Sequence, residues 1–276
     1  MLVSAQETGE TEKEEDKPQR PAFESNFIID NPTDLLYLKN SLEVVINHRM
    51  GEISGGNNDI LGIYGAANIR IGLSYTLHER LQIGFGTEKE QKYQDFNWKV
   101  GIFKQTRSNR IPVNVTYYGN FVIDASKKDN FAVDQHRYSY FNQLIISRRF
   151  SPNFSMQLAP SMTHFNAVPA NMNNDVFSMA LGARMIVSAQ TAILLDYSQP
   201  ITSFGVDDQG NDLNPEFGLS LGAEFVTSSH AFQIYLTNLR GIVPQQNYMF
   251  NDNRFFNMFG GNGVLLGFTI TRIYNF

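Results

Sequence analysis

The stretch Gly263–Phe276, reading GVLLGFTITRIYNF, decides the fold of this chain. Its apolar residues recur at every second position, which is the period of a β-strand and not of a helix. One face of this strand carries Leu266, Phe268, Ile270, Tyr274 and Phe276, and the other carries Gly267, Thr269, Thr271 and Asn275. The sequence therefore ends on a strand with one apolar and one polar face, and its last residue is aromatic.

The same alternation recurs through most of the chain and predicts twelve strands. The predicted strands are 41–49, 68–77, 81–87, 96–106, 112–123, 137–150, 154–165, 176–187, 192–199, 217–225, 231–238 and 263–276. The links between them sort by parity: those after the second, fourth, sixth, eighth and tenth strands are short, and the others are longer. In an up-and-down meander, alternate links lie at the same end, so one end is predicted to carry tight turns and the other long loops.

The composition is typical of a transmembrane β-barrel, whose wall faces lipid on the outside and water on the inside. The 276 residues include 22 Phe, 12 Tyr and 21 Gly but no Cys, so disulfides and thiolate metal sites are excluded. No apolar run approaches the ~18 residues that a membrane helix needs. The formal net charge is −5, and the chain has no basic field that would favour nucleic acid as a partner.

Two resemblances point to the bacterial outer membrane. A terminal strand that ends on an aromatic residue resembles the closing strand of outer-membrane β-barrels. The segments INHRMG (46–51), GGNNDILGIYGAANIRIGLSY (55–75) and GFTITRIY (267–274) resemble an uncharacterised family of outer-membrane β-barrels in Bacteroidota. This resemblance implies a membrane barrel with outer-membrane lipid around it, and it transfers no activity, catalytic residue or cofactor.

The predicted fold is thus all-β: a closed, up-and-down, antiparallel transmembrane β-barrel of about twelve strands, preceded by a disordered N-terminal tail. Residues 1–6 (MLVSAQ) read as the remnant of a signal peptide, because small residues stand at the −3 and −1 positions of a cleavage site. Residues 7–35 are predicted to be a flexible periplasmic tail, since the densely charged part of this segment cannot bury enough surface to order itself. Residues 36–276 form the barrel, whose even strand number places both termini in the periplasm.

If the apolar face of each strand contacts lipid, then a set of charged side chains points into the lumen. We expect these lumen-lining residues to be Glu43, Arg70, Lys99, Arg184, Asp196 and Glu224. Three acids and three bases in a confined space can pair and close the barrel, or they can line a narrow channel for small polar solutes. The sequence leaves both interpretations open, together with an accessory role beside other envelope proteins.

Two alternative functions are weighed against this prediction. An outer-membrane lipase would use His48 as its base, but Ser54, six residues later, does not match the spacing of such enzymes. A soluble β-barrel that binds an apolar ligand is the second alternative. The loop Asp207–Asp212 is rich in carboxylates, but it lacks the ligand spacing of a calcium loop, so no metal or cofactor is predicted.

The last long loop, NYMFNDNRFFNMFGGNG (247–263), concentrates aromatic residues outside any predicted strand. We expect these rings to pack inward into the mouth of the barrel, because exposed rings at this density would favour aggregation. The rings are Tyr248, Phe250, Phe255, Phe256 and Phe259.

Overall fold

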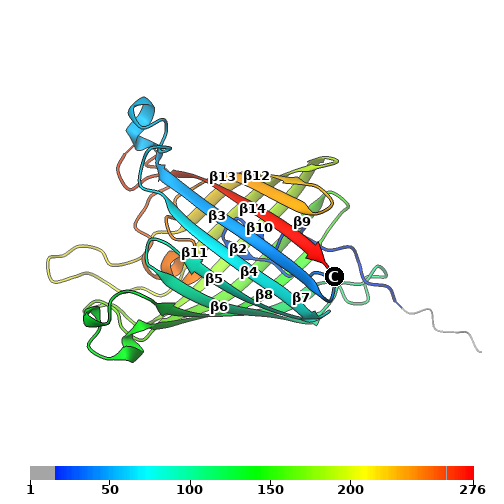
Figure 1. Ribbon diagram of the computed structural model, residues 1–276, viewed down its shortest axis with the longest axis horizontal. Coiled ribbons are helices and arrows are strands. Elements are labelled where there is room, and N and C mark those ends of the chain that lie inside the picture. Colours follow the sequence, from blue (N-terminus) through cyan, green and yellow to red (C-terminus); the bar gives the residue numbers. More distant parts are fainter. Residues whose placement is uncertain (1–15, 259) are drawn as a thin grey trace, which may run out of the picture.

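The computed structural model describes residues 16–258 and 260–276, and the predicted signal remnant lies outside these ranges. Twelve strands of the described chain form one closed barrel (Figure 1). These wall strands are β3 (Ser41–Glu52), β4 (Asn68–His78), β5 (Leu81–Glu88), β6 (Tyr93–Phe103), β7 (Asn114–Asp124), β8 (Tyr138–Arg149), β9 (Phe154–Phe165), β10 (Asp175–Ser188), β11 (Thr191–Pro200), β12 (Gly218–Val226), β13 (His230–Thr237) and β14 (Leu265–Asn275). None of the helices within the described ranges is both long enough and apolar enough to span a bilayer.

Each wall strand pairs antiparallel with its neighbours in sequence, and the last strand closes the ring against the first. In this seam Phe268 of β14 lies opposite His48 of β3, and Ile270 lies opposite Ile46. The predicted closing strand and the predicted strand number are therefore confirmed. Closure leaves no strand edge unpaired, which is what a sheet needs inside lipid.

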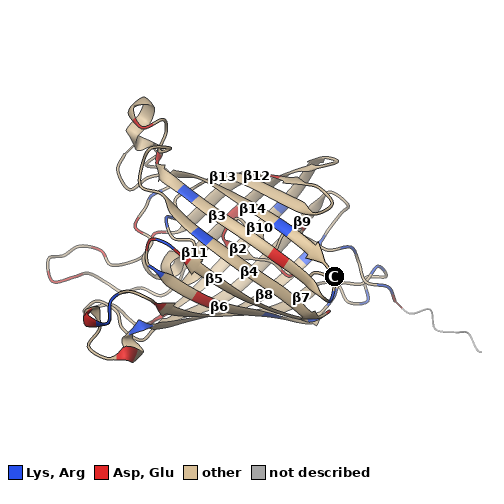
Figure 2. Cartoon of the chain, in the orientation of Figure 1, with Lys and Arg blue, Asp and Glu red and all other residues tan. Residues whose placement is uncertain are grey.

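Side chains alternate between the two faces of the wall as the sequence predicts. Along β3, for example, Val45 is 3% exposed whereas Ile46 is 37% exposed. Large apolar side chains occupy the outer face of many strands. Figure 2 shows charged residues in the loops and turns at the two ends and at separate positions along the wall strands. The outer face is thus the apolar band expected of a membrane barrel, and the inner face is polar.

The two ends of the barrel differ, although less regularly than the sequence predicts. The C-terminus and most of the tight turns lie at one end, and the long loops extend from the other (Figure 1). Two links break the predicted parity, since the β5–β6 link is the short turn 89–92 and the β6–β7 link is the longer segment 104–113. The β5–β6 link is short because β6 begins at Tyr93, which pairs with Asp124, three residues before the predicted start. The β6–β7 link is long because β6 ends at Phe103 rather than at residue 106 and β7 begins at Asn114 rather than at residue 112.

The lumen is filled by two segments that are not part of the wall. The first is the plug segment, Ala22–Leu35, which contains β1 (Phe27–Ile28) and β2 (Asn31–Pro32). These two strands pair only with each other, in a hairpin of their own. Ala22, Phe23, Ile28 and Ile29 pack into a buried cluster with wall side chains. The prediction of a flexible periplasmic tail over residues 7–35 is therefore wrong for the plug segment, and residues 7–15 lie outside the described chain.

The second filling segment comes from the link between β13 and β14. It contains the short helix α1 (Pro244–Met249), in which Gln245, Tyr248 and Met249 are all buried. The predicted inward packing of the aromatic loop is confirmed for Tyr248 but is wrong for Phe256, which is 83% exposed. Phe255 is buried against Leu219 and Leu236, which are on the outward-facing side of β12 and β13, and the predicted ring of Phe259 lies outside the described residues. A twelve-stranded barrel is wider than its own side chains can fill, so additional segments occupy the remaining space.

Candidate functional site

The candidate site is the inner wall of the barrel where it grips the plug segment. All six residues that we expected to line the lumen, Glu43, Arg70, Lys99, Arg184, Asp196 and Glu224, are buried, with at most 7% of each residue exposed. Their alternation with exposed neighbours places them on the inner face, and four of them bond directly to the plug segment. The other two, Arg70 and Arg184, pair with carboxylates of the wall.

Near the end of the barrel that carries the C-terminus, Asn26 is held between an acid and a base. The Lys99 ammonium donates to the carbonyl oxygen of Asn26 at 2.8 Å and to its Oδ1 at 3.1 Å. The Asn26 amide in turn donates to the Glu43 carboxylate. Asn26 of the plug segment thus provides hydrogen-bond partners for both Lys99 of β6 and Glu43 of β3.

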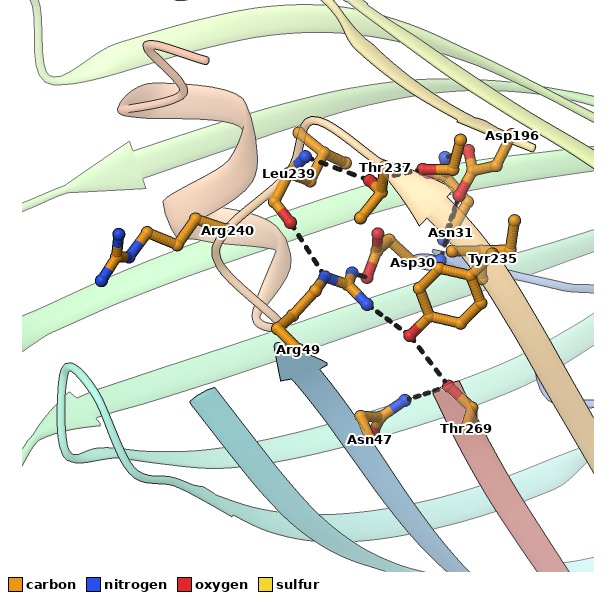
Figure 3. Close-up of polar contacts among 12 residues, drawn as sticks. Asp30, Asn31, Asn47, Arg49, Asp196, Tyr235, Thr237, Leu239, Arg240 and Thr269 are labelled. Carbon is orange, nitrogen blue, oxygen red and sulfur yellow. Dashed lines mark hydrogen bonds and ion pairs between the residues drawn. The ribbon is translucent and has the colours of Figure 1, made fainter. Parts of the chain in front are cut away.

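Deeper in the lumen, the tip of the hairpin meets a second acid and a second base. The Asp196 carboxylate accepts from the backbone N–H groups of Asp30 (3.0 Å) and Asn31 (3.2 Å), and also from the Asn31 side chain. The Asp30 carboxylate pairs with the guanidinium of Arg49 (Figure 3). Because Glu43 and Arg49 are six residues apart on β3, the hairpin reaches about 20 Å along that strand.

Arg49 joins the wall to both filling segments. Its Nε donates to the carbonyl oxygen of Leu239 at 2.8 Å, and its two terminal nitrogens donate to Tyr235 and Asp30. Figure 3 shows these three partners converging on one guanidinium from β13, the following link and the hairpin. The Tyr248 hydroxyl of α1 also donates to Asn31 Oδ1 at 2.6 Å. The two filling segments therefore contact each other inside the barrel.

Two further ion pairs belong to the wall itself. Arg70 binds Asp95 through two nitrogens, each 2.7 Å from a carboxylate oxygen, and Arg184 Nε lies 2.6 Å from Glu224 Oε2. Ser25 of the plug segment then donates to the other Glu224 oxygen at 2.7 Å. Arg49 and Asp95 are lumen residues that were not among the predicted ones. Counting at period 2 from Glu43 along β3 would have placed Arg49 on the inner face.

Little space remains between the hairpin and the wall. A cavity of about 10 Å³, enough for one water molecule, lies between Phe27, Asp30, Arg70 and α1. A wider cavity of about 300 Å³ lies at the long-loop end and is lined by Tyr93, Phe131, Arg137 and Phe250, among others. The lumen is thus closed in the middle and open toward its mouth.

One part of the inner wall carries buried polar atoms that have no partner among the described residues. They belong to strands β8–β10 and include Gln143 Oε1 and Nε2, Gln157 Oε1, Ser161 Oγ, Thr163 Oγ1 and Ser178 Oγ. Buried polar groups in folded proteins are normally hydrogen-bonded to protein or to ordered water. This uncharged polar strip is therefore a surface suited to water or to a polar solute.

The residues of the lipase hypothesis are not brought together. The His48 ring faces outward and stacks on Phe268, with ring centroids 4.9 Å apart. Ser54 Oγ bonds to Glu52 rather than to His48. In the loop Asp207–Asp212, the side-chain and backbone amides of Asn211 donate to Asp207 and lower the pKa of its carboxyl. The Asp207 carboxylate thus stabilises a turn within its own loop through hydrogen bonds from Asn211.

The sequence of residues 23–274 matches the model of a protein family described as "Membrane bound beta barrel domain (DUF5777)". The chain belongs to this family. The match begins at Phe23 and so includes nearly all of the plug segment, which makes that segment part of the domain. No curated protein matches the sequence.

Two solved structures share the fold of this membrane-bound barrel at low sequence identity. An outer membrane channel from Pseudomonas putida F1 (COG4313) is 10% identical, with 87% of this chain and 97% of that chain covered and a TM-score of 0.51. The NanC porin is 8% identical, with 85% of this chain and 99% of that chain covered and a TM-score of 0.50. The barrel is thus similar in fold to outer-membrane porins and channels.

Proposed function

We propose that this barrel is an outer-membrane channel for small polar solutes, and that the plug segment and α1 hold it closed in the conformation described. The proposal makes the six inner-wall charges, Glu43, Arg70, Lys99, Arg184, Asp196 and Glu224, the lining of the solute pathway. The mouth cavity and the uncharged polar strip on β8–β10 would form the rest of the pathway. The fold similarity to a porin and an outer membrane channel supports this assignment.

The observation that carries the proposal is the way in which the hairpin is attached. β1 and β2 pair with each other and with no wall strand, so the hairpin can leave the lumen without breaking the barrel's backbone ladder. Wall side chains hold it through polar contacts as well as through the apolar cluster of Phe23, Ile28 and Ile29, and water or a solute can replace the polar contacts. A segment needed only as permanent filling would gain more from apolar packing than from charged contacts that require desolvation.

We also propose how the barrel is oriented in the outer membrane and how solutes pass through it. Both termini face the periplasm, the apolar outer band contacts outer-membrane lipid, and passage through the lumen is passive and involves no enzymatic step. Residues 16–20 and Phe276 lie at the same end of the barrel (Figure 1), which supports a common side for the two termini. The proposal also places this outer membrane in Bacteroidota, which the family resemblance seen in the sequence supports.

A disulfide that locks the plug segment tests the proposal in the full chain. A Cβ atom placed on Gly182 of β10 lies 3.0 Å from Ile28 Cγ2, so the double variant Ile28→Cys/Gly182→Cys can form a cross-link. The chain has no native cysteine that would compete. In a planar bilayer we expect the oxidised variant to stay closed and the reduced variant to open. The single variants control for the substitutions.

Conductance of the oxidised lock equal to that of the reduced protein would refute the plug as the closing element. Silence of both forms and of the unsubstituted chain at every voltage would refute the channel. That result would favour a structural or accessory barrel.

A further inference from the structure

We propose that the inner wall is a peptide-binding surface, and that the solutes of the channel are short peptides with free termini. This inference rests on the proposed channel function and specifies its substrate class. The plug segment is itself a peptide bound in the lumen, so its contacts show which chemical groups the wall recognises.

The wall contacts the backbone of the plug segment at six points. Three wall side chains donate to carbonyl oxygens: Lys99 to Asn26 (2.8 Å), Gln233 to Phe27 (3.0 Å) and Gln157 to Pro32 (2.8 Å). Two side chains accept from amides: Gln233 from Ile29 (3.2 Å), and Asp196 from Asp30 (3.0 Å) and Asn31 (3.2 Å). Any peptide presents these donors and acceptors, whatever its side chains.

The charges of the same surface match the two ends of a peptide. Arg49 binds the Asp30 carboxylate, and it would bind a terminal carboxylate in the same way. Asp196 collects N–H donors and Glu43 accepts from an amide, so both carboxylates suit a terminal ammonium. Arg49 and Asp196 can therefore contact the same occupant, one through its carboxylate and the other through its ammonium group.

The free energy of binding in the lumen should favour a zwitterionic peptide over an uncharged solute. When the plug segment leaves, Arg49 loses its carboxylate partner and Asp196 loses its three donors. Water then solvates both charges, but the ammonium and carboxylate of a peptide can restore charge-assisted hydrogen bonds to them, which are roughly twice as strong as bonds between neutral groups. An uncharged sugar of the same size satisfies these groups only partly, whereas a zwitterionic peptide satisfies both. The lumen should thus pass peptides more readily than sugars.

Liposome swelling tests this inference, with the reduced Ile28→Cys/Gly182→Cys protein as the conducting form. We expect dialanine, a zwitterionic dipeptide, to enter several-fold faster than xylose, an uncharged sugar of similar mass. In addition, Asp196→Asn in this background should bring the ratio of the two rates close to one, even if the rate for xylose rises because the plug segment is held less firmly. The matched control is Glu88→Gln, because Glu88 is a buried carboxylate that bonds to Asn68 and Gln91 and not to the plug segment.

The outcomes separate the two proposals. Entry of neither solute refutes the channel itself. Equal entry of dialanine and xylose leaves the channel in place and refutes peptide selectivity. A preference for dialanine that survives Asp196→Asn refutes the role of this wall surface, whereas loss of the preference in Asp196→Asn but not in Glu88→Gln supports it.

Discussion

Asp30, at the tip of the hairpin, and Arg49, on the inner face of β3, form an ion pair whose side chains are 5% and 1% exposed. No other ion pair among the described residues joins the plug segment to the wall. Removing one partner leaves the other charge buried and unpaired, at a cost of about 3–5 kcal/mol. This single contact is therefore the most direct means of shifting the plug segment out of the lumen.

We predict that Asp30→Asn releases the plug segment from the wall. In an Ile28→Cys background, the rate at which a maleimide labels the buried cysteine should rise more than tenfold, because 1.4 kcal/mol already corresponds to a factor of ten. The double variant Asp30→Asn/Arg49→Met should label more slowly than Asp30→Asn, since replacing both members of a buried pair by neutral or apolar groups is often tolerated. Unchanged labelling in Asp30→Asn would contradict the anchoring role of the pair.

The orientation of the barrel predicts which end is accessible from outside the cell. Asp208 lies in the long β11–β12 loop and Ala189 in the tight β10–β11 turn, and both are exposed. A membrane-impermeant maleimide added to intact cells should label Asp208→Cys and spare Ala189→Cys. Both should be labelled after the outer membrane is permeabilised. Labelling of Ala189→Cys alone in intact cells would reverse the assigned orientation.

The chain has one tryptophan, and its position reports whether the outer face contacts lipid. Trp98 lies over Gly119, where an added Cβ would be only 2.3 Å from the indole, on the same face as the exposed Phe96 and Val100. In bilayers of phospholipids brominated on their acyl chains, the Trp98 emission should be strongly quenched. The variant Trp98→Phe/Tyr118→Trp moves the indole to the inner face and should be quenched much less. Equal quenching would mean that the outer face is not the lipid contact.

Substitution of Phe276 should reduce the assembly of the barrel in cells without reducing the stability of the folded barrel. Its side chain is 81% exposed, so it contributes little packing to the folded wall. We expect Phe276→Ala to refold in detergent and to keep the shift in gel mobility between unheated and boiled samples in SDS. The amount that reaches the outer membrane of cells should nevertheless fall several-fold, because a terminal aromatic resembles the usual assembly signal. Normal assembly of Phe276→Ala would remove this role.

His48 provides a test of the lipase alternative. Because its ring stacks on Phe268 at the seam, His48→Ala should lower the free energy of unfolding by about 0.5–1.5 kcal/mol. Neither the variant nor the unsubstituted protein should hydrolyse lipid esters in detergent. Ester hydrolysis that disappears in His48→Ala would instead favour the enzyme.

Much of the wall could be predicted from the sequence, because period-2 alternation is a direct consequence of a sheet that separates lipid from a polar lumen. The errors lie where strand ends are set by pairing. Asp95 was missed because β6 was expected to begin at Phe96, and the register with β7 extends the strand back to Tyr93. Arg49 was missed because it is the last residue of the predicted strand 41–49, although it shares the parity of Glu43.

The plug segment could not be predicted by the same reasoning. Its two strands contain only two residues each, and neither pairs with the wall. Such a hairpin has no stability of its own, and its order comes from lumen contacts with residues far away in the sequence. A local signal did exist: the apolar residues Phe23, Phe27, Ile28 and Ile29 follow the charged tail, and they indicated burial.

The position of the plug segment also constrains the order of steps in which the barrel assembles. The segment precedes β3 in the chain and lies within the ring that β14 completes by pairing with β3. The plug segment, which is made early, is therefore enclosed by the pairing of the last strand. Unless the segment is threaded in afterwards, the barrel forms around contents that were made before its own walls.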